Sequence, residues 1–101
     1  MKMLFSAEFP HEPFNALVRN GSAGKLLFSI IEDLKPEAVY FTEQDGKRGV
    51  FLVIEVAGAS DIPRISEPFF LKLNADCRFR IVMTPKDLEK AGLETLGIKW
   101  E

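Results

Sequence analysis

The hydrophobic pattern is clearest in a predicted hairpin between Ala38 and Ala57. Two runs of strand-forming residues flank Asp45-Gly46, a pair favoured in tight hairpin turns because Gly adopts a positive φ freely and Asp tolerates one. The run from Val50 to Ile54 is apolar at every position, whereas a strand with one face in water alternates. We therefore predict strands over 38–43 and 49–57, with both faces of the second strand covered.

The first third of the chain alternates and then changes to a helical spacing. Apolar side chains at every second position predict a strand from Lys2 to Phe9. Pro13 suits the first turn of a helix, where its missing N–H has no partner to lose. Spacings of three and four then favour one long helix to Lys35, with this apolar stripe: Phe14, Leu17, Val18, Gly21, Gly24, Leu27, Phe28, Ile31 and Leu34. Asn20-Gly21-Ser22 leaves a second interpretation open, in which two helices are joined by a short loop.

A second helical pattern follows the hairpin. Ser60 or Asp61 is expected to cap this helix, and an acid there also suits the positive end of the helix dipole. Pro68 lies inside the pattern and is expected to kink the helix or divide it, because proline lacks an N–H and clashes with the preceding turn. The helix is expected to end over 74–76. Its apolar stripe consists of Ile62, Ile65, Phe69 and Leu73.

The last quarter of the chain begins with a predicted strand from Cys77 to Met83. One side of this strand carries Cys77, Phe79, Ile81 and Met83, and the other carries Arg78, Arg80 and Val82. Thr84-Pro85, with an acid three residues after the threonine, predicts a short capped helix to Ala91, stopped by Gly92. The remaining tail alternates at Leu96, Ile98 and Trp100, which is the pattern of a further strand.

The element order is strand, helix, strand, strand, helix, strand, followed by a short helix and a tail. This order predicts one α+β domain over residues 1–101 with the ferredoxin-like βαββαβ fold, an antiparallel sheet with both helices on one face. The first and third strands lie at its centre. Val50, Leu52, Ile54 and Val56 would then face the helices, while Phe51, Val53 and Ala57 lie on a bare face. Exposed apolar faces of this kind mark interaction surfaces, so we expect a homodimer that packs sheet face on sheet face.

Composition and charge narrow the function classes. The hydrophobic share of 47% and the charged share of 28% are those of a soluble globular chain. No run approaches the ~18 apolar residues of a membrane span, and the apolar start is too short for a signal peptide, so we expect a cytoplasmic protein without a membrane partner. The net charge of −2 gives no bulk attraction for phosphate backbones. Arg48-Gly49-Val50-Phe51-Leu52-Val53 matches an RNA-recognition pattern only in part, with Val50 and Leu52 at its stacking positions, so nucleic acid is not expected either.

The layout resembles the dimeric α/β-barrel superfamily, which includes muconolactone isomerases, cofactor-less antibiotic-biosynthesis monooxygenases and stress-responsive barrel proteins. Three features over residues 2–84 carry the resemblance: the strand order, the doubly apolar strand GVFLVIEVA, and the Thr84-Pro85 exit from the last strand. The small uncharacterised bacterial members are the most similar in layout. The resemblance implies a homodimer with a cavity, between sheet and helices or between two sheets, for a small aromatic or apolar molecule. No catalytic motif of these families is present.

Charged and polar side chains fall on the bare face among apolar ones. The set is Ser6, Glu8, Tyr40, Thr42, Phe51, Val53, Glu55, Arg78 and Arg80. Buried charges must pair, reach water or meet a ligand. In the functional interpretation, Arg78 or Arg80 holds an anionic group while Glu8, Glu55 or Tyr40 handles a proton. In the alternative interpretation these groups form salt bridges at the dimer interface or its rim, and the arginines discourage edge-to-edge aggregation.

Other candidate residues are isolated. His11 is the only histidine, suited to acid–base chemistry or a metal, although a loop histidine between prolines is more often solvated. Cys77, the only cysteine, is expected to pack in the core. Without a His/Cys cluster, a phosphate loop or a dinucleotide fingerprint, we expect no metal and no cofactor. Trp100 is expected either to anchor the tail across the dimer or to close a cavity mouth, unless the terminus is loose.

Two hypotheses of different classes follow. The first is a dimeric barrel that binds or transforms a small, partly apolar organic molecule in a cavity lined by Tyr40, Glu55 and Arg80. The second is a non-enzymatic dimerisation or interaction module, in which the sheet face is interface alone and the tail adds a strand to the partner. The sequence does not decide whether the protein is an enzyme.

Overall fold

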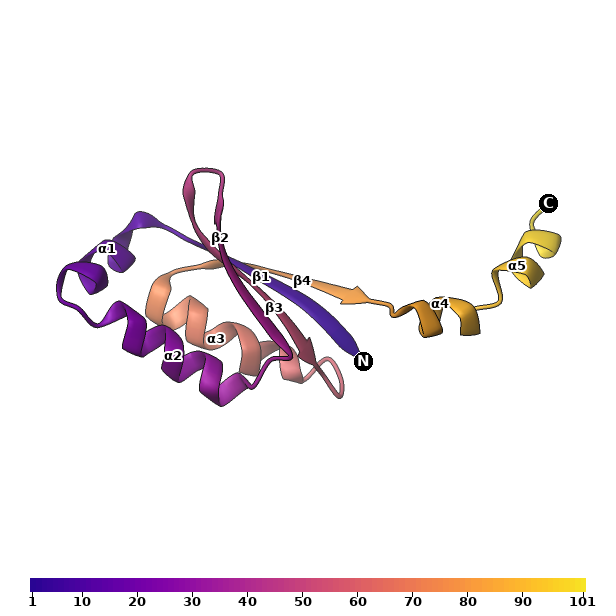
Figure 1. Ribbon diagram of the computed structural model, residues 1–101, viewed down its shortest axis with the longest axis horizontal. Helices are drawn as coiled ribbons and strands as arrows, with labels where there is room; N and C mark the ends of the chain where they lie inside the picture. Colours follow the sequence, from indigo (N-terminus) through magenta and orange to yellow (C-terminus); the bar gives the residue numbers. More distant parts are fainter.

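The computed structural model describes residues 1–101. Four strands and five helices follow one another in this order: β1 (Lys2–Phe9), α1 (His11–Arg19), α2 (Ala23–Leu34), β2 (Ala38–Gln44), β3 (Lys47–Glu55), α3 (Asp61–Leu73), β4 (Asp76–Val82), α4 (Pro85–Lys90) and α5 (Leu93–Lys99). The strands form one antiparallel sheet in the order β2-β3-β1-β4. Helices α1, α2 and α3 lie on one side of this sheet (Figure 1). This is the predicted ferredoxin-like α+β fold, with β1 and β3 at the centre.

The core lies between the sheet and these three helices. Alternate residues of β1 and β3 point into it, as the two-residue period predicts, and the helices contribute their apolar stripes. The fully buried ring of Phe5 is centred 5.1 Å from Phe69 and 5.2 Å from Phe79. The core consists of Met3, Phe5, Ala7, Phe9, Phe14, Ile30, Leu34, Val50, Leu52, Ile54, Val56, Ile65, Phe69, Leu73 and Ala75.

The hairpin turn has the expected chemistry. Asp45 and Gly46 both take positive φ, 51° and 79°, which makes the turn twist in the same sense as the strands. The N–H of Gly46 donates to the Glu43 carboxylate at 2.9 Å. The apolar run predicted to be covered on both sides has Val50, Leu52 and Ile54 against the helices. Its other side is uncovered in the single chain.

The prediction of one long first helix is wrong. The chain breaks at Asn20-Gly21-Ser22, where Gly21 takes φ 79°. The N–H of Ser22 donates to the Leu17 carbonyl at 2.9 Å and that of Gly21 to the Val18 carbonyl at 3.1 Å, which is the Schellman termination that glycine favours. The break resets the helical phase, so Val18 and Phe28 of the predicted stripe are exposed while Leu26 and Ile30 pack inward.

Pro68 was expected to kink the second helix or to divide it, and the division is wrong, because α3 runs from Asp61 to Leu73 without interruption. Its inward residues keep one phase and pack against β1, which outweighs the one hydrogen bond that Pro68 cannot donate. Ser60 occupies the N-cap position without a side-chain bond. The Asp61 carboxylate instead accepts from the N–H of Ala57 at 2.8 Å, so it fixes the loop before the helix.

Residues after β4 form helices that lie away from the rest of the molecule (Figure 1). The predicted cap of α4 is confirmed: Thr84 and Asp87 exchange bonds of 3.0 and 3.1 Å between side chain and backbone. The predicted strand in the tail is wrong, since Leu93–Lys99 is the helix α5. A strand needs a neighbouring edge to pair with, and the tail lies beside none, so its N–H groups bond within the segment, as from Trp100 to the Leu96 carbonyl at 3.0 Å.

No helix in the chain combines the length and the apolar character that crossing a membrane requires.

Candidate functional site

The face of the sheet opposite the helices, here called the open face, is built from cross-strand rows. The pairing register places two rows of side chains at the middle of this face, and each row contains one side chain from each of the four strands. The first row is Tyr40, Phe51, Ser6 and Arg78, and the second is Ala38, Val53, Leu4 and Arg80. The strand alternation therefore brings Tyr40, Arg78 and Arg80, predicted as site residues, into neighbouring rows.

The centre of the open face is apolar and its two sides are polar. Leu4, Phe51 and Val53 are half-buried although nothing lies above them. Tyr40, on the β2 side, has 67% of its surface exposed. On the β4 side is a hollow of about 120 Å³ lined by Leu4, Ser6, Phe51, Arg78, Phe79 and Arg80. An apolar floor beside two guanidinium groups suits a small molecule with a ring and an anionic substituent.

Arg78 and Arg80 are the charges of this face that no carboxylate balances. Neither makes a hydrogen bond or an ion pair in the single chain, and Asp76, two residues before Arg78 on the same side of β4, is more than 4.0 Å away. Both are exposed. If a partner surface buries these guanidinium groups away from water, they must acquire an anionic partner, because an unpaired buried charge costs several kcal/mol.

Glu8 is neutralised within its own chain. It is only 8% exposed and lies 3.6 Å from the Lys47 ammonium. The side chain of Gln44 crosses over Gly49, in the space that a Cβ there would fill, and donates to the Ala7 carbonyl at 3.3 Å. Glu8 therefore lies one row away from the hollow and is already paired with Lys47.

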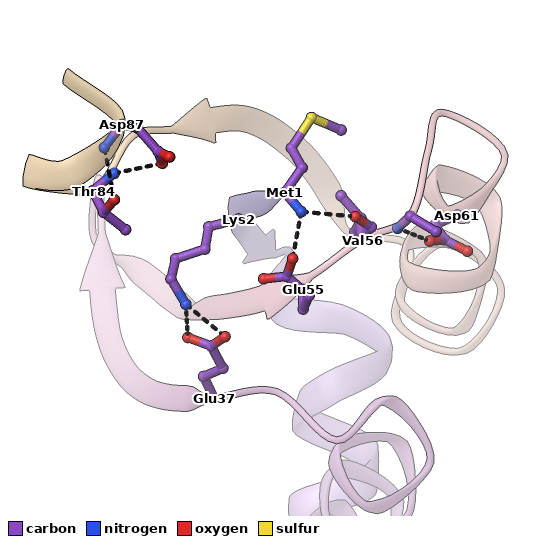
Figure 2. A network of polar contacts seen from close by, with 9 residues as sticks. Met1, Lys2, Glu37, Glu55, Val56, Asp61, Thr84 and Asp87 are labelled. Carbon is purple, nitrogen blue, oxygen red and sulfur yellow. Dashed lines mark hydrogen bonds and ion pairs between the residues drawn. The ribbon is translucent and has the colours of Figure 1, made fainter. Parts of the chain in front are cut away.

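Glu55 lies at the end of the open face, in a group of ion pairs (Figure 2). Its carboxylate bonds the amino group of Met1, which lowers the Glu55 pKa, while Lys2 bonds Glu37 at 2.6 and 2.7 Å, which raises the Lys2 pKa. The Asp87 pKa is lowered by the backbone N–H of Thr84. Glu55 therefore does not lie in the same row as Tyr40 or Arg80, with which it was predicted to line a cavity. It belongs to the next row, and its carboxylate already has a partner.

His11 does not join this face. It is exposed at the start of α1, in the helix layer beyond the end of β1. No group of three or more His, Cys, Asp or Glu side chains is placed to hold a metal ion. The two residues at the stacking positions of the RNA-recognition pattern, Val50 and Leu52, do not point to the open face but towards the helices. Arg48 of the same pattern lies over the Phe14 ring at 4.7 Å.

Cys77 packs against the core, and burial raises its pKa to about 12, with Asp76 and Glu67 adding to the effect. Since only the thiolate is nucleophilic, Cys77 is expected to react with a disulfide reagent at pH 8 much more slowly in the native protein than after unfolding in guanidinium. A thiol titration of both states measures this. Equal reaction rates of the native and the unfolded protein would contradict the packing of Cys77 against the core.

The raised pKa of Cys77 also affects stability. The protonated thiol stabilises the native state fully below pH 9, the unfolded pKa, and this contribution is lost as the pH rises from 9 to 12.

Three contributors to the face were not named as site residues from the sequence. Leu4 supplies part of the apolar floor, and the Gln44 side chain lies over Gly49, the cross-strand neighbour of Glu8. Leu4 had a signal, because it shares the strand parity of Ser6 and Glu8. The crossing of Gln44 over Gly49 had none, since it depends on the exact hairpin register.

The sheet order, the helix layer and the uncovered face define a ferredoxin-like α+β protein. No protein-family model matches the chain, and no curated protein matches it. Among solved structures, it is similar in fold to the 5-chloro-2-hydroxyhydroquinone dehydrochlorinase TftG of Burkholderia phenoliruptrix AC1100, in complex with 2,5-dihydroxybenzoquinone. The TM-score is 0.61 at 19% identity, covering 85% of this chain and 97% of that one. A de novo designed protein, Ferredog-Diesel, has a TM-score of 0.48 at 14% identity, covering 80% of this chain and 85% of the design.

Proposed function

We propose that two copies of this chain pack open face to open face, as in the dimeric α/β barrels, and hold between them a small, partly apolar organic molecule with an anionic group. The observation that carries the proposal is the composition of the open face: an apolar centre beside two guanidinium groups without a carboxylate. The apolar centre favours a partner surface. The unbalanced arginines favour an anion within it.

A second copy would bring the remaining polar group to the same place. In one chain, β2 and β4 are three strand spacings apart, about 14 Å, so Tyr40 and Arg80 cannot readily hold one small ring. A twofold axis parallel to the strands places β2 of one copy above β4 of the other. The partner's Tyr40 would then lie above Arg78 and Arg80, with its hydroxyl able to donate to the bound anion.

The fold similarity to TftG supports a small-molecule site, since the structure of that protein holds a small organic ligand. Loss or transfer of a proton is the simplest chemistry available here, because Tyr40 is the one titratable group of the middle rows that is neither an arginine nor already paired. Glu8 is paired with Lys47, and Glu55 is paired with Met1. We therefore assign binding to the arginines and leave Tyr40 as the proton-handling candidate.

One observation favours the second candidate, an interaction module without a ligand. The hollow of about 120 Å³ in the single chain is smaller than the roughly 300 Å³ at which ligand pockets usually begin. The dimeric proposal requires that the partner's face add the rest of the cavity. In the module, the interface is closed and Arg78 and Arg80 reach water at its rim.

The two candidates differ in a thermal-shift screen. Benzoate and other small aromatic carboxylates are expected to raise the unfolding temperature, because a ligand at a hundredfold excess over its Kd stabilises the native state by about 2.7 kcal/mol. Benzyl alcohol, which lacks the anion, is expected to give little. Equal stabilisation by neutral and anionic compounds would contradict anion recognition on this face. The absence of stabilisation by any of the compounds would contradict it as well.

Arg80→Gln is expected to remove most of the shift caused by the carboxylates, lowering their affinity by about tenfold or more through loss of a charge-assisted pair. Arg19→Gln is the matched control, because Arg19 is exposed on α1 near Glu12 and away from the open face. Titration calorimetry on both variants measures the affinities. Equal loss in the two variants would indicate a nonspecific charge effect.

A further inference from the structure

The residues after β4, 83–101, form an extension that we call the C-terminal arm. It carries α4 and α5 and leaves the molecule beyond the end of β4 (Figure 1). No residue beyond Phe79 belongs to the hydrophobic core or packs against it. The chain is consequently 60 Å long but 27 Å and 19 Å across.

The arm is apolar along one side although none of its side chains packs against the core. Leu93, Leu96 and Trp100 recur at three and four residues, the spacing of a buried helical stripe. All three are exposed, Trp100 to 76%, and so is Leu88 of α4. Isolated helices shorter than about 12 residues are marginal in water, and α4 and α5 have six and seven. The arm therefore needs a surface to lie on.

The exposed surface area of the chain indicates how much contact surface the extended arm leaves uncovered. The chain exposes 6982 Å², whereas a compact chain of 11.4 kDa exposes about 5800 Å². The excess, about 1200 Å², exceeds the ~800 Å² that each partner buries in a stable protein–protein interface. Its radius of gyration of 17.1 Å is likewise larger than the roughly 13 Å of a compact domain of this length.

The point at which the arm departs connects it to the open face. Val82, the last residue of β4, shares a cross-strand row with Lys2 and Glu55 at the end of that face. The reciprocal bonds of Thr84 and Asp87 fix the direction in which the chain continues, and Figure 2 shows this cap beside the same ion pairs. A copy placed on the open face would lie beside the start of the arm.

We propose that the C-terminal arm of each chain lies on the second copy and closes one end of the space between the two sheets. The partner is a second copy because the arm is continuous with the face that such a copy would cover, and because the excess area is more than each partner needs to bury in a stable interface. The inference rests on the proposed sheet-face dimer and extends it. The arm would shield the end of the cavity, with the indole of Trp100 buried in the dimer.

Trp100 is the only tryptophan, so its fluorescence reports the arm directly. In the unmodified chain we expect dimers in which the Trp100 emission is blue-shifted and acrylamide quenches it poorly. Dilution below the dimer Kd, followed by sedimentation, is expected to shift emission to the red and increase quenching in step with dissociation. This coupling distinguishes an arm on the partner from an arm folded onto its own chain.

Two variants of α5 test the contact. Leu96→Asp puts a carboxylate into the apolar side of the helix and is expected to raise the dimer Kd by about tenfold or more. Thr95→Asp adds the same charge to the other side and is expected to change it less than about twofold. Circular dichroism establishes that both variants keep the native fold.

The outcomes separate this inference from the proposed function. A dimer whose Trp100 remains solvent-exposed overturns the arm contact and leaves the sheet-face dimer intact. A monomer overturns both proposals. A protected Trp100 that stays protected after dissociation also overturns the contact with the partner, because the arm then lies on its own chain.

Discussion

Phe5→Ala is expected to lower the free energy of unfolding by about 3–5 kcal/mol, a large part of a small domain's stability. Phe5 lies at the centre of β1, fully buried between the rings of Phe69 and Phe79. Removing the ring loses its transfer free energy and leaves a cavity that neighbours held by the sheet and α3 cannot fill. Urea unfolding at one fixed chain concentration measures the change. Phe5→Leu keeps the measurement possible if the alanine variant does not fold.

Phe28→Ala is the matched control for this experiment. Phe28 is a helical phenylalanine with 68% of its surface exposed, on the outer side of α2. The same atoms are removed, but little of their surface was buried, so the change is expected to stay within about 0.5 kcal/mol. Equal losses in both variants would mean that the assignment of the inward face of the sheet is wrong.

Val53→Asp is expected to convert the proposed dimer into folded monomers. Val53 lies in the middle of the open face, next to Leu4 and Ala38 in the pairing register. A carboxylate there would be buried without a partner in a dimer, a cost of about 3 kcal/mol or more, which corresponds to roughly a hundredfold rise in Kd. In the monomer the same carboxylate reaches water, so the fold is expected to persist. Light scattering gives the mass and circular dichroism the fold.

Leu71→Asp provides the comparison on the other side of the molecule. Leu71 is 77% exposed on the outer side of α3, away from the open face. The substitution adds the same charge to an apolar position without touching the proposed interface, so the dimer Kd is expected to stay unchanged. If the two single variants were both monomeric, or both still dimeric, sheet-face pairing would lose its support.

The sheet could be predicted from the sequence because its signals are local and regular. Asp45-Gly46 defines the hairpin, and the two-residue period divides β1 and β3 into an inward and an outward side. The helices were less predictable where two local signals competed. Continuity of the apolar stripe favoured one helix through Asn20-Gly21, but the left-handed conformation available to Gly21 allowed a Schellman end and a new phase.

The structure of the tail could not be predicted from its alternation, because a strand also needs a neighbouring edge to pair with. Leu96, Ile98 and Trp100 fit a strand, but Leu93, Leu96 and Trp100 fit a helix equally well, and only local hydrogen bonds are available at that distance from the sheet. For the open face, strand parity placed Tyr40, Arg78 and Arg80 on the same side of the sheet, as the pairing register has them. The ion pairs of Glu8 and Glu55 could not be predicted from the sequence, because they depend on where the fold places Lys47 and the amino group of Met1.

The central claim is that a second copy covers the open face, and the native mass in solution tests it most directly. Sedimentation equilibrium of the unmodified chain at micromolar concentration is expected to give twice the chain mass of 11.4 kDa. The Val53→Asp chain under the same conditions is expected to give one chain mass. A single-chain mass for the unmodified protein over the whole accessible concentration range would contradict the account.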